Sequence, residues 1–214
     1  MRDFKLYVIT DERFHPGRSL TDVIEEAIIG GANIIQLRDK TSSKLEVLEK
    51  ARALRWLTKE YDVPFIVNDH IDVAIAVDAD GVHLGQDDLP LEEARKILGP
   101  EKIIGISTHS IDQAKAAENG GADYIGVGPV FPTGTKADVV DPVTTQYVKE
   151  AVEQINIPFV AIGGIKLHNV DQVLKAGARS VCAVSEIVGA PDVKSVCRQF
   201  LEKIEASRNR ETSK

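Results

Sequence analysis

Eight short apolar segments, separated by longer stretches with helical periodicity, constrain the fold of this 214-residue chain more than any other feature. The segments are rich in Val and Ile and are apolar on both faces, as strands buried inside a parallel sheet are. Between them, apolar residues recur every three or four positions opposite Glu and Lys, which is typical of helices that cover such a sheet. The predicted strands are Leu6–Ile9, Asn33–Leu37, Phe65–Val67, Gly81–Leu84, Ile103–Ile106, Tyr124–Val127, Phe159–Ile162 and Ser180–Ala183.

This alternation predicts an α/β protein, and eight such units in about 200 residues predict a single-domain (β/α)8 TIM barrel. An open, doubly wound sheet is the alternative, because alternation alone does not separate the two folds. The turn after Thr10 lacks the Gly-x-Gly-x-x-Gly dinucleotide fingerprint, which favours the barrel. We expect residues 1–206 to form the barrel and residues 207–214, which lack apolar side chains, to form a frayed tail.

The charge balance argues against polyanionic partners. With 33 acidic and 26 basic residues the formal charge is −7, so neither nucleic acid nor an anionic membrane is expected as a partner. No apolar run reaches the about 18 to 20 residues that span a membrane. Cys182 and Cys197 are the only cysteines, and they lack metal-ligand spacing. We therefore expect a cytoplasmic protein that acts on small molecules.

Polar residues cluster directly after the predicted strands, where the active sites of TIM barrels lie. Arg38 and Lys40 are two residues apart in extended chain and point to one side, which suits a clamp for a diphosphate. Asp69 and Asp88 follow neighbouring strands, and two carboxylates in one pocket favour a cation such as Mg²⁺ between them. The alternatives are a solvated ion pair with Asp39, a helix cap at Asp69 and a turn at Asp88.

A second anionic subsite is predicted on the other side of the barrel. Gly163–Gly164 and Val184–Ser185 follow the last two strands, where barrels commonly bind a phosphate through backbone N–H groups. The long loop Pro129–Lys136 carries Thr133 and Thr135 beside a lysine, which suits a lid over an anionic ligand. A tight turn and a plain flexible connection are the alternatives for these two segments.

The residues after the strands also form a set of motifs that is specific as a whole, although its single pieces are not. The motifs are Gln36-Leu37-Arg38-x-Lys40, Val67-Asn68-Asp69, Ala79-Asp80-Gly81-Val82-His83-Leu84-Gly85-Gln86-x-Asp88, Ser107-x-His109, Gly126-x-Gly128-Pro129-x-Phe131-x-Thr133-x-Thr135-Lys136 and Ala161-Ile162-Gly163-Gly164-Ile165. On these motifs the chain, from about Leu6 to its last helix, resembles the thiamine phosphate synthase family, also called thiamine phosphate pyrophosphorylase.

The resemblance implies a transferase of thiamine biosynthesis. Such an enzyme condenses 4-amino-2-methyl-5-(diphosphooxymethyl)pyrimidine with a thiazole phosphate, usually its carboxylated form, and releases thiamine phosphate and diphosphate. CO₂ is lost when the carboxylated substrate is used. The implied mechanism is dissociative loss of diphosphate and attack by the thiazole nitrogen, with Mg²⁺ as the cofactor. The resemblance also suggests a homodimer.

The resemblance further implies roles for individual residues. The implied catalytic residues are Arg38, Lys40, Ser107 and Lys136. The implied substrate-binding residues are Gln36, Leu37, Arg38, Asp39, Lys40, Asn68, Ser107, Thr133, Gly134, Thr135, Lys136, Gly164, Val184 and Ser185. The implied metal ligands are Asp69 and Asp88.

Two positions depart from the family pattern. Gly134 stands where many relatives have a hydroxyl residue, and Glu186 stands where a small residue is expected. A carboxylate beside a bound phosphate is unfavourable, so we expect the Glu186 side chain to face away from the phosphate site.

Three other functions compete with the synthase. A thiazole tautomerase shares the barrel and lacks the diphosphate chemistry, but Arg38, Lys40, Asn68, Asp69, Asp88 and Lys136 are all intact here. A regulatory barrel would bind a thiamine intermediate without turnover. A phosphosugar isomerase would need a base at a strand end, for which Glu186 is the candidate.

Overall fold

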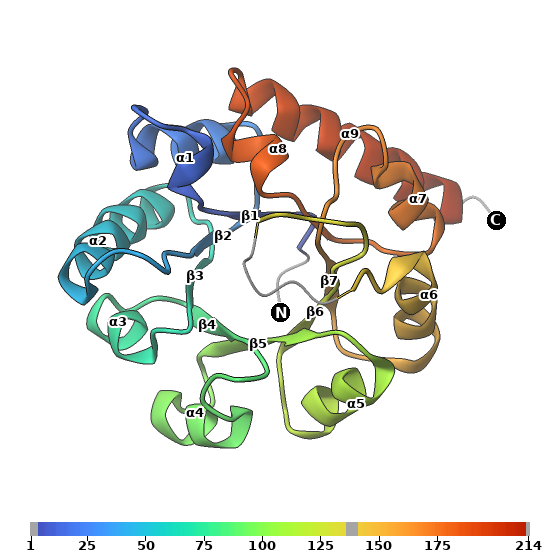
Figure 1. Cartoon of the computed structure of the whole chain (residues 1–214), viewed down its shortest axis with the longest axis horizontal. Helices are drawn as coiled ribbons and strands as arrows, with labels where there is room; N and C mark the ends of the chain where they lie inside the picture. The colour runs from blue at the N-terminus through green and yellow to red at the C-terminus, as the bar shows by residue number, and fades with distance from the viewer. Residues whose placement is uncertain (1–3, 136–140, 213–214) are drawn as a thin grey trace.

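The computed structural model describes residues 4–135 and 141–212, and in this part of the chain eight parallel strands close into a barrel (Figure 1). Each strand pairs with the next one in sequence, and β8 pairs with β1, so that Leu6 lies beside Val181. This closing pair confirms the TIM barrel and excludes the open sheet. The strands are β1 (Leu6–Ile9), β2 (Ile34–Leu37), β3 (Phe65–Asn68), β4 (Gly81–Leu84), β5 (Ile103–Thr108), β6 (Tyr124–Val127), β7 (Phe159–Ala161) and β8 (Val181–Cys182).

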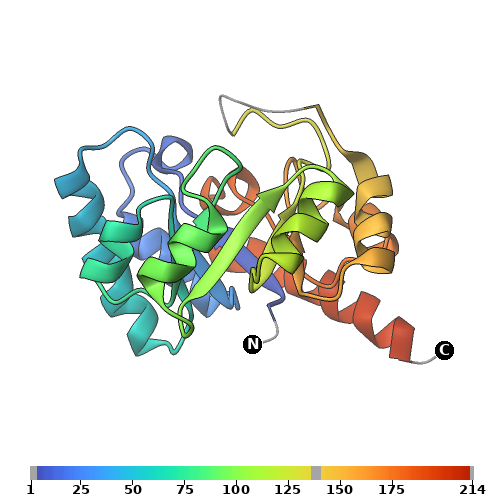
Figure 2. The same cartoon turned by 90° about the horizontal axis from the view of Figure 1, so that it is seen from below.

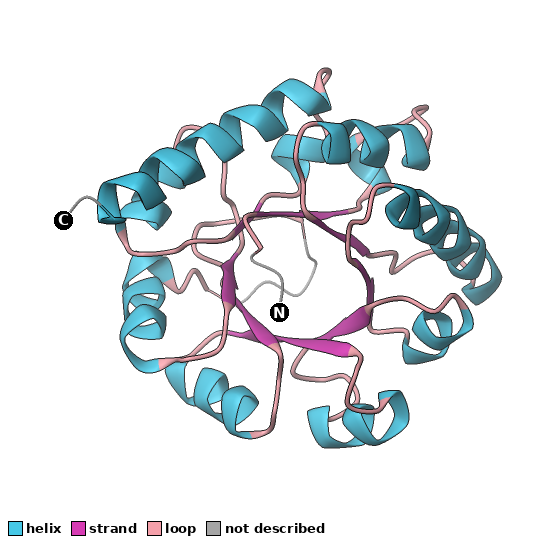
Figure 3. Cartoon of the chain, turned by 180° about the vertical axis from the view of Figure 1, so that it is seen from behind, coloured by secondary structure: helices cyan, strands magenta, loops and turns pink. Residues whose placement is uncertain are grey.

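The helices form an outer ring around the strands (Figure 3). Because every strand is buried on its outer side by this ring and on its inner side by the barrel interior, both of its faces are apolar, as the sequence predicts. The helices are a 3-10 turn η1 (Glu12–Phe14), α1 (Leu20–Ile29), α2 (Lys44–Glu60), α3 (Ile71–Ala76), α4 (Leu91–Leu98), α5 (Ile111–Asn119), α6 (Thr144–Gln154), α7 (Val170–Lys175), α8 (Ser185–Val188) and α9 (Val193–Thr212).

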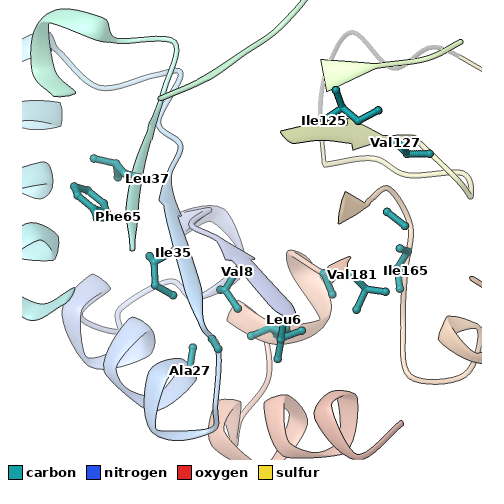
Figure 4. Packing of buried hydrophobic residues seen from close by; sticks show 14 of the residues in the cluster. Leu6, Val8, Ala27, Ile35, Leu37, Phe65, Ile125, Val127, Ile165 and Val181 are labelled. Atoms are coloured by element: carbon teal, nitrogen blue, oxygen red, sulfur yellow. The ribbon is translucent and has the colours of Figure 1, made fainter. Parts of the chain in front are cut away.

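The core has two layers, because successive side chains of a strand point to opposite sides. Leu6 and Val8 of β1 point outward into the layer between strands and helices, which Figure 4 shows together with Ala27 of α1. Tyr7 and Ile9 of the same strand belong to a second cluster inside the barrel. The members of this inner cluster are Phe4, Tyr7, Ile9, Ile34, Ile66, Tyr124, Val160 and Cys182.

A capping box fixes the start of α2 and thereby the loop that follows β2. The Ser43 hydroxyl accepts a hydrogen bond from the Glu46 N–H at 3.3 Å, and the Glu46 carboxylate accepts one from the Ser43 N–H at 2.7 Å. Such a box satisfies backbone donors that the first helical turn leaves unpaired. The loop carrying residues 38–40 is therefore held between a buried strand and a well-capped helix.

The last helix continues beyond the predicted start of the tail. We expected fraying from Ser207, but α9 extends to Thr212. Arg208 donates hydrogen bonds to the carbonyls of Arg179 at 2.7 Å and Phe4 at 3.2 Å, which tie this part of the helix to the barrel. Loss of apolar residues therefore did not mark the end of the helix. Within the described residues, no helix combines the length and the apolar character that a membrane crossing needs.

Gly81 is required by the close approach of β4 to β5. A Cβ atom at this position would lie 2.0 Å from the carbonyl oxygen of Ile103, which belongs to the backbone and cannot rotate away. We expect Gly81→Ala to lower the free energy of unfolding by about 1 to 3 kcal/mol, the usual cost of overpacking a core. Urea or thermal unfolding measures this difference.

Gly126→Ala is the matched control, because a Cβ atom there would meet its nearest neighbour, His83, at an ordinary 3.5 Å. A Gly81→Ala variant as stable as Gly126→Ala would show that the β4 and β5 backbones separate without cost, contrary to this account of the barrel wall.

Candidate active site

A cavity of about 370 Å³ opens at the carboxyl ends of the strands. In Figure 2 the loop after β6 stands above the end of the barrel toward which β5 points. The inner cluster forms the floor of the cavity through Tyr7, Ile9, Tyr124, Val160 and Cys182. The predicted substrate-binding residues that line the cavity are Gln36, Arg38, Asn68, Ser107, Thr133, Gly134, Thr135, Gly164, Val184 and Ser185.

Two predicted substrate-binding residues have their side chains elsewhere. Leu37 is buried in the layer between strands and helices, which leaves only its backbone for a ligand contact. The carboxylate of Asp39 accepts hydrogen bonds from the N–H groups of Thr41 and Ser42, both at 3.0 Å, and from Lys50 at 2.7 Å. Asp39 therefore shapes the loop after β2. Its contact with a ligand remains a prediction, as does the role of Lys136, which lies outside the described residues.

Lys40, Asp69 and Asp88 form a charged group next to the residues that line the cavity. Lys40 makes an ion pair with Asp69, and Asp88 accepts a hydrogen bond from the Gly85 N–H at 2.6 Å. Asp69 has a left-handed backbone with φ of 60°, which is costly for a residue other than glycine and marks a constrained turn. The predicted juxtaposition of Arg38–Lys40 with the two acids is thus present at the mouth of the barrel.

The carboxylates of Asp69 and Asp88 interact directly, and their pKa values are shifted in opposite directions. Burial raises the pKa of Asp69, and the neighbouring Asp88 raises it further against the opposing effect of Lys40. Burial also acts to raise the pKa of Asp88, but hydrogen bonds from Asp69 and from the Gly85 N–H outweigh it, so that this pKa is lowered. The pair is therefore arranged to share a proton or a cation.

The donor chemistry of this pair fits a hard divalent cation. Among the described residues, no group of three His, Cys, Asp or Glu side chains is suitable for a metal. Mg²⁺ commonly takes only one or two protein carboxylates and completes its shell with water and substrate phosphates. Asp69 and Asp88 therefore fit the protein's share of such a shell.

Arg38 is held in the cavity wall by the first two strands. The Thr10 hydroxyl accepts a hydrogen bond from the Arg38 N–H at 2.9 Å and donates one to its carbonyl at 3.2 Å. Burial lowers the pKa of Arg38, with Asp11 opposing the shift and Arg13 adding to it. An arginine remains cationic through such a shift, because its ordinary pKa is above 12. A half-buried guanidinium of this kind is suited to an anionic ligand.

Sequence reasoning missed the pair formed by Asp11 and Arg13 after β1. Arg13 donates to both carboxylate oxygens of Asp11, at 2.8 and 2.5 Å, and to the Thr135 carbonyl at 2.5 Å. This contact joins the loop after β1 to the loop after β6 across the cavity mouth. No motif marks the pair, since an acid and a base two residues apart are common on protein surfaces.

A polar chain below the cavity mouth was also missed. It runs from Gln36 through Tyr7 and Tyr124 to His83 and Ser107, with successive contacts of 2.7, 2.8, 2.9 and 2.9 Å. Both tyrosines were read as apolar strand residues. Their place inside the barrel follows only from the alternation of β1 and β6. His109 has a structural partner, because its Nδ1 atom donates to the Gly128 carbonyl at 2.6 Å.

The glycine pair after β7 packs against the loop after β6. Gly163 and Gly164 have φ values of 98° and 63°, and a Cβ atom at Gly164 would lie 2.5 Å from the Pro132 carbonyl oxygen. A tight turn and close backbone packing therefore explain these glycines at least as directly as a phosphate contact does. Among the described residues, no atom lies within 4 Å of a Cβ position at Gly134 in the same loop, so its missing hydroxyl leaves space on the side of these residues.

Glu186 is not among the residues that line the cavity. Its carboxylate accepts a hydrogen bond from the Leu167 N–H at 3.4 Å, which agrees with the expectation that it faces away from the phosphate site. Glu186 therefore does not supply the cavity with the base that a phosphosugar isomerase would need.

Comparison with known proteins identifies the family of this chain. The sequence model of thiamine monophosphate synthase matches residues 6–187. The thiamine-phosphate synthase of Halalkalibacterium halodurans is 70% identical over 200 residues, which are 94% of this chain and 95% of that protein. The chain belongs to the thiamine monophosphate synthase family. The family resemblance predicted from the sequence is confirmed.

Two further members of the thiamine monophosphate synthase family support this assignment. The thiamine-phosphate synthase of Shouchella clausii is 64% identical over 205 residues, covering 96% of this chain and 98% of that protein. The structure of thiamine phosphate pyrophosphorylase from Pyrococcus furiosus superposes with a TM-score of 0.87 at 42% identity, covering 96% of this chain and 97% of that one. The chain is thus a transferase of thiamine biosynthesis with the TIM-barrel fold.

Asp39 is expected to support the stability of this family member rather than its chemistry. Asp39→Asn should lower the free energy of unfolding at pH 7 by about 1 to 3 kcal/mol, because Lys50 loses its buried partner and two N–H groups lose a charged acceptor. Burial acts to raise the pKa of Asp39, but hydrogen bonds from Lys50, Ser42 and Thr41 outweigh it and lower the pKa well below its ordinary range.

A carboxyl group whose pKa is lower in the folded state stabilises above its unfolded pKa and loses that effect as the pH falls. The stability gap between the wild type and Asp39→Asn should therefore shrink as the pH is lowered from about 5 toward 2. Urea unfolding across this range tests the expectation, with the exposed Glu49→Gln on α2 as control. A gap that stays constant down to pH 2 would contradict it.

Proposed function

We propose that this enzyme forms thiamine phosphate in one cavity with two anionic subsites. The subsite at Arg38, Lys40 and Asn68 takes the diphosphate of the pyrimidine substrate, together with Mg²⁺ on Asp69 and Asp88. The opposite wall takes the thiazole phosphate and its carboxylate, through Thr133–Thr135, Gly164 and Val184–Ser185. The observation that carries the proposal is the charged group of Arg38, Lys40 and two interacting carboxylates at one side of the cavity mouth.

The first subsite favours departure of the diphosphate. Arg38 offers a planar, bidentate donor from the cavity wall, and Lys40 offers a mobile point charge that now pairs with Asp69. When bound, Mg²⁺ neutralises charge on phosphate oxygens, a contribution worth several kcal/mol. With a cation held by Asp69 and Asp88, Lys40 would be available to the diphosphate. Preorganised positive charge of this kind stabilises the charge that develops on the leaving group.

The floor of the cavity protects the cation that remains on the pyrimidine. The aminopyrimidine ring is electron-rich and delocalises positive charge at the adjacent carbon once the C–O bond to diphosphate breaks. Ile9, Val160 and Ile162 line the cavity and exclude water from this carbon. Ser107 contacts the pyrimidine ring from the end of β5.

The second subsite brings the thiazole nitrogen to the cation. Thr133 and Thr135 carry hydroxyl groups into the loop over the cavity, and the two hydroxyls lie 3.2 Å apart. Gly164 and Ser185 line the same cavity, and their backbone N–H groups are the proposed donors to the phosphate. Anchoring the phosphate at a fixed distance converts the attack into an effectively unimolecular step. Lys136, outside the described residues, is proposed to complete this subsite.

The mechanism requires no side-chain nucleophile, because the thiazole nitrogen forms the new bond. The two cysteines suit this arrangement, since both are buried. Burial raises the pKa of Cys197 to about 12, which keeps it a thiol. The cytoplasmic location expected from the sequence remains a proposal. The proposed homodimer rests on the family resemblance, and light scattering of the purified protein tests it.

Asp88 provides the sharpest test of the metal and of the reaction. With both substrates and Mg²⁺, the wild type should release diphosphate and thiamine phosphate in equal amounts, followed by mass spectrometry, and EDTA should stop both. Asp88→Ala should lower the rate by at least about 100-fold, as expected when a contribution of several kcal/mol is lost.

The adjacent, exposed Asp87→Ala is the control and should retain the wild-type rate. Turnover that survives EDTA or Asp88→Ala would refute the metal role. Substrate binding without any turnover in the wild type would favour a tautomerase or a sensor instead.

Arg38→Lys tests the bidentate contact with the diphosphate. The substitution keeps the charge but loses the planar fork, so kcat/KM for the pyrimidine diphosphate should fall about 10-fold. The KM for the thiazole phosphate should be unchanged. Steady-state kinetics with each substrate varied in turn measures both values. Arg52→Lys, an exposed change on α2, controls for the substitution itself, and an equal effect on both substrates would place Arg38 outside the diphosphate subsite.

A further inference from the structure

The polar chain of Gln36, Tyr7, Tyr124, His83 and Ser107 crosses the barrel interior from β2 to β5. It passes through two phenols that are almost fully buried, Tyr7 at 2% exposure and Tyr124 at 0%. Their rings pack edge to face, with centroids 6.0 Å apart. All five residues line the cavity, with Tyr7 and Tyr124 in its floor, and Gln36 is itself buried at 1% exposure.

The barrel wall is shaped around this chain. A Cβ atom at Gly105 of β5 would lie 2.1 Å from the Tyr124 ring, so the ring occupies space that any other residue would fill. On β6, a Cβ atom at Gly126 would lie 3.5 Å from the His83 ring. These two glycines face the interior on neighbouring strands and leave room for the aromatic rings.

The hydrogen bonds of this polar chain can be given one donor-to-acceptor direction by counting the protons on each side chain. Gln36 presents its amide nitrogen to the Tyr7 hydroxyl, and an amide nitrogen only donates. Tyr7 therefore accepts from Gln36, and we assign its single proton to the contact with Tyr124, in which one of the two hydroxyls has to donate. Burial raises the pKa of both phenols, so each keeps the one proton that this scheme requires.

The same direction continues to the end of the chain. With Tyr7 as the donor to Tyr124, the proton of Tyr124 is assigned to its contact with His83 Nδ1, where the ring tautomer decides which atom donates. A neutral histidine that accepts at Nδ1 carries its proton on Nε2, and this atom donates to the Ser107 hydroxyl. Ser107 has then filled its acceptor role toward the protein and directs its own proton to the cavity.

We propose that Tyr7, Tyr124 and His83 are positioning residues that set Ser107 as a hydrogen-bond donor and Gln36, through Oε1, as an acceptor in the cavity. The proposal rests on the proposed function of this cavity. An aminopyrimidine matches the pair, because it has ring nitrogens that accept and an amino group that donates. A pyrimidine with a carbonyl in place of the amino group presents the opposite pattern and is rejected. Buried polar groups left unpaired are the usual basis of such discrimination.

The tautomer of His83 is the first test, and it needs no activity. The ¹⁵N shifts of the histidine rings in the full-length, substrate-free protein at pH 8 distinguish the two neutral tautomers and the doubly protonated ring. The His83 signals are assigned as those missing from His83→Gln. We expect Nε2 to be protonated and Nδ1 to be bare in the wild type. A proton on Nδ1 would reverse the chain and overturn the proposal, whether or not the enzyme turns over.

Tyr124→Phe is the second test, because it removes one hydroxyl from the middle of the chain. The His83 signals should then shift to a mixture of tautomers. The kcat/KM for the pyrimidine diphosphate should fall about 10-fold, the effect of one misplaced hydrogen bond, while the KM for the thiazole phosphate should not change. Tyr61→Phe is the matched control, since Tyr61 is a partly exposed tyrosine whose hydroxyl binds Glu25 on the outer surface.

The third measurement separates positioning from general loss of structure. Inhibition constants are compared for unreactive amino and oxo forms of the pyrimidine diphosphate. The wild type should favour the amino form by at least about 10-fold, and Tyr124→Phe should bring the ratio toward one. A ratio that Tyr124→Phe leaves intact would overturn the proposal. If that variant does not fold, the tautomer of His83 in the wild type still decides it.

Discussion

Closure of the strands into a ring is the constraint on which the other features of this enzyme depend. The contact of β8 with β1 removes both sheet edges and gives every strand one face toward the helices and one toward a shared interior. The interior must be filled, because a void would forfeit packing on all sides. Phe4, Ile34 and Ile66 fill its lower part with apolar side chains, whereas Tyr7 and Tyr124 bring hydroxyl groups into the upper part. The floor of the active site is thus the top layer of the core.

Charge at the mouth of the barrel is balanced pair by pair. Asp11 accepts hydrogen bonds from Arg13 and interacts electrostatically with Arg38, and Asp69 pairs with Lys40 while it interacts with Asp88. Among the described residues, Arg38 and Lys40, which are proposed to meet the diphosphate, each have an acidic neighbour. The substrate-free site therefore avoids the repulsion of unpaired like charges. Under the proposed function, an incoming diphosphate would exchange partners with the acids instead of meeting a bare cluster. The same exchange would explain why two carboxylates stand beside a proposed anion site.

The sequence was sufficient for the fold because strand number and apolar periodicity determine closure. It was less informative about which side chains enter the cavity. Arg38 and Ser107 were predicted from their places at strand ends, and both line the cavity. Leu37 lies between two residues that point inward, so its own side chain points outward because side chains alternate along a strand. Tyr7 and Tyr124 were not identifiable, since strands buried on both faces show no polar side to set the direction of each residue. The end of α9 was misjudged because contacts of Arg208 with distant carbonyls leave no local pattern.

The fit of Tyr124 against Gly105 has a consequence for the history of this barrel. The ring and a side chain at position 105 exclude each other, since a Cβ atom there would lie 2.1 Å from the ring. A lineage that acquires a larger residue at 105 must first give up the tyrosine, and one that loses the tyrosine opens a hole beside the glycine. Either substitution alone is expected to destabilise the barrel, so positions 105 and 124 should change together during evolution or remain unchanged. A pair that changes jointly in a descendant would mark a barrel in which the interior has been rebuilt for another ligand.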